Sequence, residues 1–342
     1  MSIEISAVDT VTALNTTLAA KLTPMLVGSP GIGKSDIVKS VAKMHNLKLI
    51  DVRLAQSDPT DLNGFPTLQK DGTRMDYAPP MTFPLETDAI PQGYDGWLLF
   101  LDEINAAPPT IQAAAYKLVL DRQIGAHNLH KRVAIVCAGN KATDKAIVNR
   151  LSTAMQSRMV HLNLMVDVPT WLEWANSNGI DHRVISFVKF RPELLHNFKP
   201  NHADDTFASP RTWEFASKII INKDELTRVD HAVLVGTVGE GPALEFRAFL
   251  EVYKDLPDID TMINEPTTVK IPNEPGHQYA MTTLISHNAK EDTIAPLMII
   301  IKKLPVEFQV VVLKDIYASN PELKGHAIIK SWIALNADAL FG

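Results

Sequence analysis

The chain has 342 residues, 46% of them hydrophobic and 21% charged, a balance that excludes a disordered protein and predicts two or three globular domains. Its formal net charge of −6 excludes an overall positive field for nucleic acid or an anionic membrane, although a local basic patch stays open. The apolar runs are far shorter than the roughly 20 residues that span a bilayer, and the first ten residues lack the features of a signal peptide. We therefore expect a soluble, cytoplasmic protein with no membrane span.

The first part of the chain shows a helix, a strand and a second helix. Apolar residues three to four apart predict a helix over residues 6–20. The short apolar run 24–28 then predicts a strand, and helical spacing returns from Lys34 after a glycine-containing loop. These patterns place a loop between a strand and a helix.

Three further apolar runs end in polar residues, which is typical of parallel strands buried on both faces. They cover residues 47–54, 96–103 and 131–140. Because helical segments lie between them, we predict a doubly wound α/β sheet with right-handed crossovers over residues 1–163. The single cysteine, Cys137, lies in the last run and cannot form an internal disulfide, so we expect a small buried strand residue in a reducing compartment.

Helical patterns replace the strand-like runs in the rest of the chain. They cover residues 171–176, 183–190, 210–221 and 243–253. We predict a helical domain over residues 164–255, a proline-rich linker over 256–278 and a helical C-terminal region over 279–342. Trp171 and Trp174 are three residues apart, which is more typical of the core of the helical domain than of a binding stripe.

Residues 28–35, GSPGIGKS, match the phosphate-binding pattern G-x-x-x-x-G-K-[ST] between a strand and a helix. The nucleotide-binding candidates are Gly28, Ser29, Pro30, Gly31, Ile32, Gly33, Lys34 and Ser35. The glycines let backbone N–H groups turn toward phosphates, and the helix presents its positive end to the same charge. We expect Lys34 to reach the outer phosphates and the Ser35 hydroxyl to ligate Mg²⁺. A chance glycine-rich turn is the alternative, and the flanking strand and helix disfavour it.

Two carboxylates, Asp102 and Glu103, follow the apolar run 98–101. We expect Asp102 to hold Mg²⁺ and Glu103 to polarise the attacking water. Asn140 closes the third run at the same edge of the sheet, where an amide can orient water or the terminal phosphate. Its alternative role is to cap the next turn. The expected cofactors are ATP and Mg²⁺, although a P-loop reads phosphates and leaves the base open.

The segments GSPGIGKS, LLFLDEINAAPPTIQAAAYKLVLDRQI and VAIVCAGN resemble the core of the MoxR family of AAA+ ATPases over residues 24–163. The resemblance implies an AAA+ P-loop core with a parallel doubly wound sheet, a helical lid and a helical C-terminal region. It also implies a hexameric ring, a homo-oligomer whose ATP sites lie between subunits. The sensor 1 residue of the family would be Asn140.

The same resemblance implies arginines that act on the nucleotide. The finger would be Arg158, in the place of the family's L-D-R-F arginine, but that stretch reads QSRM here, so Arg150 stays a second candidate. Sensor 2 would be Arg211. From the residues alone, Ser209 as N-cap and Pro210 at the first position predict a helix that begins there. A cation in its first turn gains nothing from the helix dipole, so a phosphate partner is a reasonable explanation.

Residues 55–80 resemble a family insertion that faces the pore of the ring. Gly64, Phe65 and Tyr77 are candidates for gripping a substrate there, and the DG and PP dipeptides fit a hairpin or a loop. An ordinary surface hairpin is the alternative. His127 and His130 are spaced as a metal pair could be, but no cysteine or acid completes a set, so we predict hairpin residues.

The expected function is ATP hydrolysis that drives remodelling of a protein partner. Relatives in the MoxR family often work with a protein that carries a von Willebrand A domain, and the resemblance implies such a client here. A nucleic-acid motor or loader on the same core is the alternative, which the acidic net charge disfavours. A small-molecule kinase is a weaker hypothesis, because a phosphoryl acceptor would need its own basic clamp.

Overall fold

A computed structural model describes residues 3–144, 149–199, 205–223 and 225–336. The chain divides into two compact units, one of residues 1–167 and 199–201 and the other of residues 168–198 and 202–342. Within the described ranges, no helix is both long enough and apolar enough to cross a membrane.

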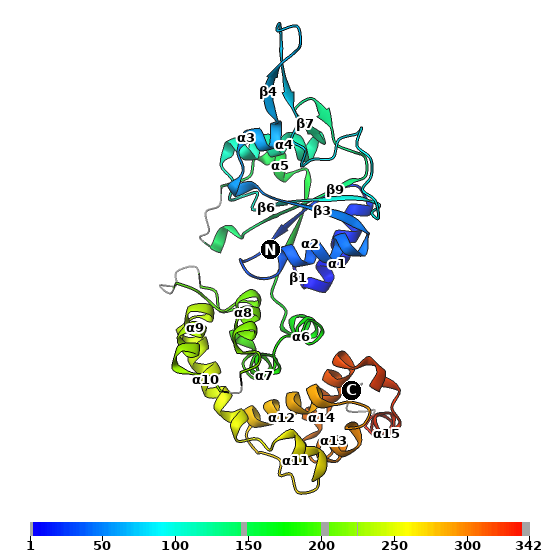
Figure 1. Cartoon of the computed structure of the whole chain (residues 1–342), viewed down its shortest axis with the longest axis vertical. Coiled ribbons are helices and arrows are strands. Elements are labelled where there is room, and N and C mark those ends of the chain that lie inside the picture. The colour runs from blue at the N-terminus through cyan, green and yellow to red at the C-terminus, as the bar shows by residue number, and fades with distance from the viewer. Residues whose placement is uncertain (1–2, 145–148, 200–204, 224, 337–342) are drawn as a thin grey trace. The chain divides into compact units, whose positions relative to one another are not determined.

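The first unit is built on a parallel six-stranded sheet with the order β1-β10-β2-β9-β6-β3 (Figure 1). Its strands are β1 (Glu4–Ile5), β2 (Thr23–Val27), β3 (Leu47–Arg53), β6 (Gly96–Asp102), β9 (Val133–Gly139) and β10 (Met159–Leu164). The α-helices of this unit are α1 (Ala7–Ala19), α2 (Lys34–Met44), α3 (Pro59–Asn63), α4 (Pro109–Leu120) and α5 (Thr153–Gln156). Short 3-10 turns are η1 (Leu54–Gln56) and η2 (Ala142–Asp144). The predicted α/β sheet is confirmed.

The central strands are buried on both faces, as their continuous apolar runs predict. Successive side chains of a strand point to opposite faces. In β6, Leu98 and Phe100 pack in the core that α1 and α2 cover, whereas Leu99 and Leu101 pack in the core under α4. Cys137 of β9 lies in the second of these cores and is fully buried, as predicted, and burial raises the pKa of its thiol to about 12.

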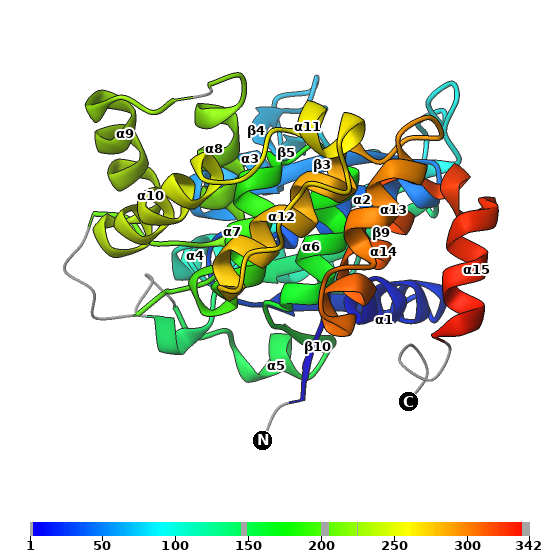
Figure 2. The same ribbon diagram turned by 90° about the horizontal axis from the view of Figure 1, so that it is seen from below.

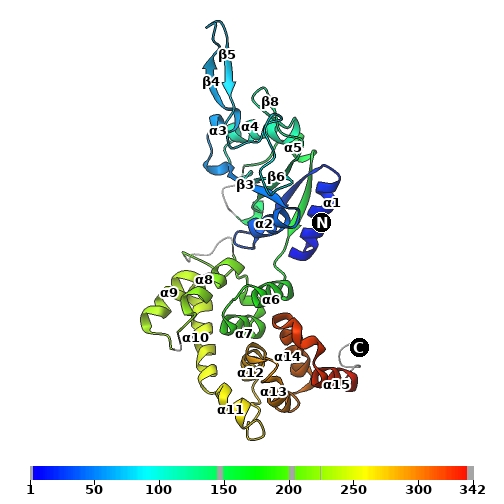
Figure 3. The ribbon, with the colours of Figure 1, turned by 45° about the vertical axis from the view of Figure 1, so that its right-hand side comes forward.

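Two antiparallel hairpins extend the first unit. One pairs β4 (Phe65–Leu68) with β5 (Met75–Ala78), and the other pairs β7 (Gln123–Ile124) with β8 (His127–Asn128). The β4–β5 hairpin projects from the unit, as Figures 1 and 3 show. Residues 55–80 thus contain a hairpin, one of the two forms that the sequence leaves open.

The second unit is helical. Its α-helices are α6 (Val168–Ser177), α7 (His182–Phe190), α8 (Pro210–Ile220), α9 (Arg228–Val238), α10 (Glu240–Lys254), α11 (Ile259–Asn264), α12 (Pro275–Asn288), α13 (Ile294–Ile301), α14 (Val306–Ser319) and α15 (Ala327–Leu335). Short 3-10 turns are η3 (Pro192–Leu194) and η4 (Pro321–Gly325). The predicted helical segments are confirmed, and Figure 2 shows α12 beside α7 and α14, in line with the contacts between these helices.

Aromatic side chains form the core where α7, α8 and α10 meet. The ring centroids of Phe187, Trp213 and Phe246 lie 5.1–5.4 Å from one another. Trp171 is 7% exposed and belongs to the interior, as predicted, whereas Trp174 is 36% exposed and lies at the surface. The two tryptophans therefore do not form a solvent-facing stripe.

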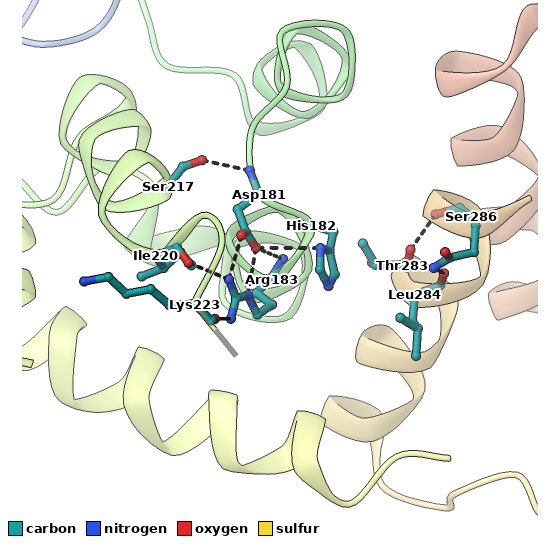
Figure 4. A network of polar contacts seen from close by, with 10 residues as sticks. Asp181, His182, Arg183, Ser217, Ile220, Lys223, Thr283, Leu284 and Ser286 are labelled. Atoms are coloured by element: carbon teal, nitrogen blue, oxygen red, sulfur yellow. Dashed lines mark hydrogen bonds and ion pairs between the residues drawn. The ribbon is translucent and has the colours of Figure 1, made fainter. Parts of the chain in front are cut away.

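A buried ion pair ties the start of α7 to the end of α8. Asp181 caps α7, and the guanidinium of Arg183 donates to both of its carboxylate oxygens at 2.8–2.9 Å (Figure 4). Arg183 also donates to the main-chain oxygens of Ile220 and Lys223. Burial acts to raise the pKa of Asp181, but the hydrogen bonds and charge of Arg183 hold it below its usual value. Arg183 therefore joins the start of α7 to the end of α8.

Residues 256–278 are more structured than the predicted proline-rich linker. They contain α11, and Met262 and Val269 are at most 5% exposed, in one core with residues of the C-terminal helices. Apolar side chains between the prolines are buried, so the segment packs against the C-terminal helices although its prolines alone indicate a spacer. The domain boundaries proposed from the sequence, at residues 163, 255 and 278, stay predictions.

Candidate nucleotide-binding site

The GSPGIGKS loop connects β2 to α2 at the carboxyl edge of the sheet. Gly33 is the N-cap of α2 and has a φ of +94°, a left-handed conformation that favours glycine. Gly31 also has a positive φ, of 78°. The loop thus wraps back toward the first turn of α2, whose backbone N–H groups and dipole form an anion-binding end.

Lys34 is the first residue of α2, and it is 8% exposed. Its ammonium group donates to the main-chain oxygens of Gly28 at 2.6 Å and Ser29 at 3.0 Å, and to Oδ1 of Asn140 at 3.0 Å. The predicted sensor candidate therefore lies against the predicted phosphate-binding lysine. The ammonium group of Lys34 is held by two loop carbonyls and by the Asn140 side chain.

Ser35 and Asp102, the two candidate ligands for Mg²⁺, lie side by side. The Ser35 hydroxyl donates to Oδ2 of Asp102 at 3.2 Å, and the backbone N–H of Glu103 donates to Oδ1 at 2.8 Å. A hydroxyl and a carboxylate are hard oxygen donors of the type that Mg²⁺ prefers, with phosphate oxygens and water completing its shell. The donor set therefore fits a Mg²⁺ ion that arrives with a nucleotide, and such an ion would neutralise phosphate charge. Among the described residues, no cluster of three or more histidine, cysteine or acidic side chains could hold a metal by itself.

Glu103 has an unusual backbone conformation, with a φ of +57°. A left-handed conformation is uncommon for a residue with a side chain, and strained backbone of this kind clusters at functional sites. Hydrogen bonds fix it: Ile104 donates to Ala138 at 3.0 Å, and Ala106 donates to the Glu103 carbonyl at 2.9 Å. The turn therefore sets where the Glu103 carboxylate leaves the strand end.

Two polar residues in this region carry no predicted role. Asn105, two residues after Glu103, is 7% exposed and hydrogen-bonds through its side chain to the backbone of Asn140. Asp51 lies on β3, beside the strand that ends in Asp102; burial raises its pKa, and the nearby Asp102 charge adds to the effect. The signals in the sequence were an amide two residues after the acidic pair and an acid inside an apolar run.

Two of the candidate arginines lie on the first unit and the third lies on the second. Arg158 follows α5, is exposed, and donates to the Ala154 carbonyl at 3.1 Å. Arg150 is also exposed on the first unit. Arg211 lies in the first turn of α8, which Ser209 caps with Pro210 at N1, as the sequence predicts. It belongs to the second unit, whereas the P-loop belongs to the first.

The pore candidates lie on the β4–β5 hairpin. Gly64 ends α3 and leads into β4, and the side chains of Phe65 and Tyr77 are 67% and 47% exposed. The second hairpin contacts the base of the first, because His127 lies 3.3 Å from the main-chain oxygen of Tyr77. His127 is thus a hairpin residue, as predicted, and His130 follows the hairpin and contacts Trp97 edge to face.

Comparisons with known proteins agree with this geometry. Residues 24–159 match the family described as the AAA domain (dynein-related subfamily). No match to the sequence is found among curated proteins. The first unit, with its P-loop between β2 and α2, is thus an AAA-type core with a parallel sheet, and the chain is an ATPase.

Solved structures with similar folds share little sequence with the chain. A protein from Cytophaga hutchinsonii ATCC 33406 is 13% identical, with 91% of this chain and 81% of that chain covered and a TM-score of 0.38. NtrX from Brucella abortus is 14% identical, with 89% and 67% covered and a TM-score of 0.36. A mutant of RuvB from Thermotoga maritima is 14% identical, with 89% and 79% covered and a TM-score of 0.34. None of these likenesses bears on function.

Proposed function

We propose that this ATPase is MoxR-like, assembles as a hexameric ring, and uses Mg-ATP hydrolysis to remodel a protein partner. The resemblance of residues 24–163 to the MoxR family supports the ring, and it suggests a partner that carries a von Willebrand A domain. The observation that carries the protein partner is the β4–β5 hairpin. It exposes four large apolar side chains on a projecting element: Phe65, Leu68, Met75 and Tyr77.

The register of the hairpin divides these side chains between its two faces. Leu68 pairs with Met75, and Pro66 pairs with Tyr77. Cross-strand partners share a face, and residues two apart along a strand share it too. One face therefore carries Pro66, Leu68, Met75 and Tyr77, which we call the apolar hairpin face, whereas Phe65 lies on the opposite face.

The apolar hairpin face is chemically suited to a polypeptide. Aliphatic side chains such as Leu68 and Met75 offer no aromatic surface for stacking bases and no charge for phosphates. Exposed apolar groups gathered on one element are typical of protein interaction sites. A thioether and a phenol beside a leucine can also adapt to segments of varied sequence.

A second candidate function is supported by the tip of the same hairpin. Lys70 and Arg74 are both exposed there, and cations on a projecting hairpin can contact a phosphate backbone. A nucleic-acid motor or loader is therefore the alternative, and it makes a different prediction for the same assay.

The test measures ATP hydrolysis with and without two probes, a purified protein that carries a von Willebrand A domain and single-stranded DNA. We expect the protein to stimulate the parent, and we expect the double variant Leu68→Ser/Tyr77→Ser to lose at least about 80% of that stimulation, because side chains buried in a contact carry most of its energy. Without either probe, hydrolysis by the double variant should stay within about twofold of the parental rate. The hairpin contributes no side chain to the group formed by the P-loop, Asp102, Glu103 and Asn140.

Two single variants on the opposite face serve as controls for the apolar hairpin face, and a third variant tests the alternative. Phe65→Ser changes the opposite face, and Thr67→Ser is a conservative change on that same face. Full stimulation by the protein in the Leu68/Tyr77 double variant would remove the docking role of the apolar hairpin face. Stimulation by single-stranded DNA that is lost in Lys70→Ala/Arg74→Ala would favour the nucleic-acid function instead.

A further inference from the structure

The side chain of Asn105 is paired with the main chain of Asn140. Nδ2 of Asn105 donates to the Asn140 carbonyl at 2.7 Å, and Oδ1 accepts from the Asn140 N–H at 3.1 Å. The amide thus uses its donor and its acceptor on one residue, as a neighbouring strand would. Because Asn140 directly follows β9, this contact holds the end of that strand after ordinary strand pairing has stopped.

The packing around this contact leaves little freedom. Asn105 is 7% exposed. A methyl group placed on Gly139 would lie closer than 3.0 Å to the side-chain amide of Asn105 and to Met25, so an alanine there would force these side chains to move. Asn105 also accepts a hydrogen bond from the Asn149 N–H at 2.6 Å through its main-chain oxygen. The residue is fixed from both its backbone and its side chain.

The contact links groups that the nucleotide site needs together. Asn105 belongs to the turn that follows Asp102 and fixes the left-handed Glu103. Asn140 in turn places its own Oδ1 at 3.0 Å from the Lys34 ammonium. A displacement of the Asn140 backbone would therefore move the amide that faces Lys34. The Asn105 side chain thus connects the turn that carries Glu103, the water-polarising candidate, to Asn140, the phosphate-sensing candidate.

We infer that Asn105 is a positioning residue for ATP hydrolysis: it clamps the main chain of Asn140 and thereby keeps the Asn140 side chain aligned with Lys34 and with the turn that carries Glu103. The inference rests on the proposed role of Asn140 at the terminal phosphate. It assigns Asn105 no contact with ATP. Asn105 acts through Asn140, so its removal lowers turnover and leaves the P-loop able to bind nucleotide.

The main variant is Asn105→Asp, which keeps the size of the side chain and the oxygen that accepts from Asn140 but replaces the donor with an oxygen facing the Asn140 carbonyl. We expect kcat to fall about tenfold or more while KM for ATP stays within about threefold, because a misaligned polar group in a closed site forfeits about one to two decades in rate. The buffer contains Mg²⁺ throughout. Binding of a non-hydrolysable ATP analogue to the full chain checks that the P-loop is intact.

A double-mutant cycle supplies a readout that a merely structural role would not move. We expect Asn140→Ala to lower kcat about tenfold or more, and we expect Asn105→Asp to add no more than about threefold on that background, since coupled residues are not additive. Independent losses that multiply would overturn the inference. If Asn140→Ala kept the parental kcat, the proposed role of Asn140 would fail, and the inference would fall with it. If Asn140→Ala lowered kcat but Asn105→Asp kept the parental kcat, the inference about Asn105 would be wrong and the proposed role of Asn140 would stand.

Gly139→Ala reaches the same contact from the opposite side, because its methyl group would displace the Asn105 amide. We expect the same pattern of lowered kcat with little change in KM. Asn320→Asp is the matched control: it alters a side-chain amide that donates to the Ala289 carbonyl at 2.6 Å in the second unit, and it should leave kcat unchanged. If Asn105→Asp and Gly139→Ala both failed to fold while the control folded, the role of Asn105 would be structural and the inference wrong.

Discussion

Asp102 and Glu103 are adjacent carboxylates, yet the structure gives them different surroundings. Oδ2 of Asp102 accepts a hydrogen bond from the Ser35 hydroxyl, and Oδ1 accepts one from the Glu103 backbone. Glu103 itself stands in a left-handed turn at the end of the strand. We propose that Asp102 holds a cation together with Ser35 and that Glu103 takes part in proton chemistry with water.

Replacing Glu103 with Gln should therefore separate binding from turnover. The change removes the charge that polarises water but keeps the side-chain length and leaves Lys34, Ser35 and Asp102 in place, so we expect Mg-ATP binding within about threefold of the parent and a kcat lower by about 10²–10⁴. The measurements are nucleotide binding by fluorescence and turnover by phosphate release. Lys34→Ala is the contrasting variant and should lose binding. Hydrolysis by Glu103→Gln at the parental rate would contradict the assignment.

At the scale of single residues, a local motif was enough to single out residues that the structure brings together, although their roles stay predictions. Lys34, Ser35 and Asp102 follow from the spacing of the P-loop and from an apolar strand that ends in acids. The contact between Asn105 and Asn140 joins residues 35 positions apart, and it depends on the register of β6 with β9. A pattern of residue types does not encode that register, so the role of Asn105 emerges only in three dimensions.

Helix α8 shows how an element presents a charged residue at some cost to itself. Ser209 and Thr212 form a capping box, and Pro210 occupies the first position, so the helix start is fixed. Arg211 stands in the first turn, where the positive end of the helix dipole opposes a cation. Arg211 is therefore unfavourable for the stability of a helix whose start is firmly capped. This is consistent with a role of Arg211 toward an anion.

Arg211→Gln should consequently raise stability and lower ATP-dependent function. Without nucleotide we expect the free energy of unfolding to increase by about 0.3–1 kcal/mol, because an unfavourable charge leaves the helix terminus. With Mg-ATP we expect weaker nucleotide binding or a lower kcat, by about fivefold or more. Urea unfolding and steady-state hydrolysis measure the two effects. Arg228→Gln, in the first turn of α9, is the matched control and should show the stability gain without the loss of function. Unchanged hydrolysis in Arg211→Gln would leave Arg211 as a solvated side chain.

Many helices of the second unit were predictable because their apolar residues recur every three to four positions, but no helical segment was predicted for α9 or α11. The start of α8 was predicted to the residue from Ser209 and Pro210. The segment 256–278 was harder, because its prolines indicate a spacer while the burial of Met262 and Val269 depends on helices that follow later in the chain. Tertiary packing there overrode a local signal.

For the molecule as a whole, we propose that one chain does not complete its own catalytic site. Lys34 supplies a cation inside the P-loop, and Asn140 beside it is neutral. Arg150 and Arg158 are exposed on the first unit, on the segment between η2 and β10. In the proposed ring, an exposed arginine of one subunit can reach the nucleotide of the next, and a cation supplied to a transferring phosphoryl group contributes about 10³–10⁵ in rate. Hydrolysis should then require assembly.

The trans role of Arg158 is tested by mixing two inactive variants. Arg158→Ala subunits keep an intact P-loop, and Lys34→Ala subunits keep an intact Arg158. Each variant alone should be nearly inactive, but mixed rings contain some interfaces at which a complete P-loop meets a complete arginine. We expect hydrolysis to recover on mixing to about a quarter of the parental rate or less, because such interfaces form only where the two kinds of subunit meet in the right order.

In the decisive control, the Lys34→Ala subunit that supplied the intact Arg158 also carries Arg158→Ala. When Arg158→Ala subunits are mixed with subunits that carry both Lys34→Ala and Arg158→Ala, no interface contains a good arginine, so hydrolysis should stay at the level of the single variants. The same pair of mixtures made with Arg150→Ala shows which arginine acts across the interface, since only the true finger yields recovery in the first mixture and none in the second. Pull-down of differently tagged subunits confirms that mixed rings form. If such rings showed no recovery for either arginine, each chain would complete its own site. The ring would then serve the protein partner rather than the chemistry.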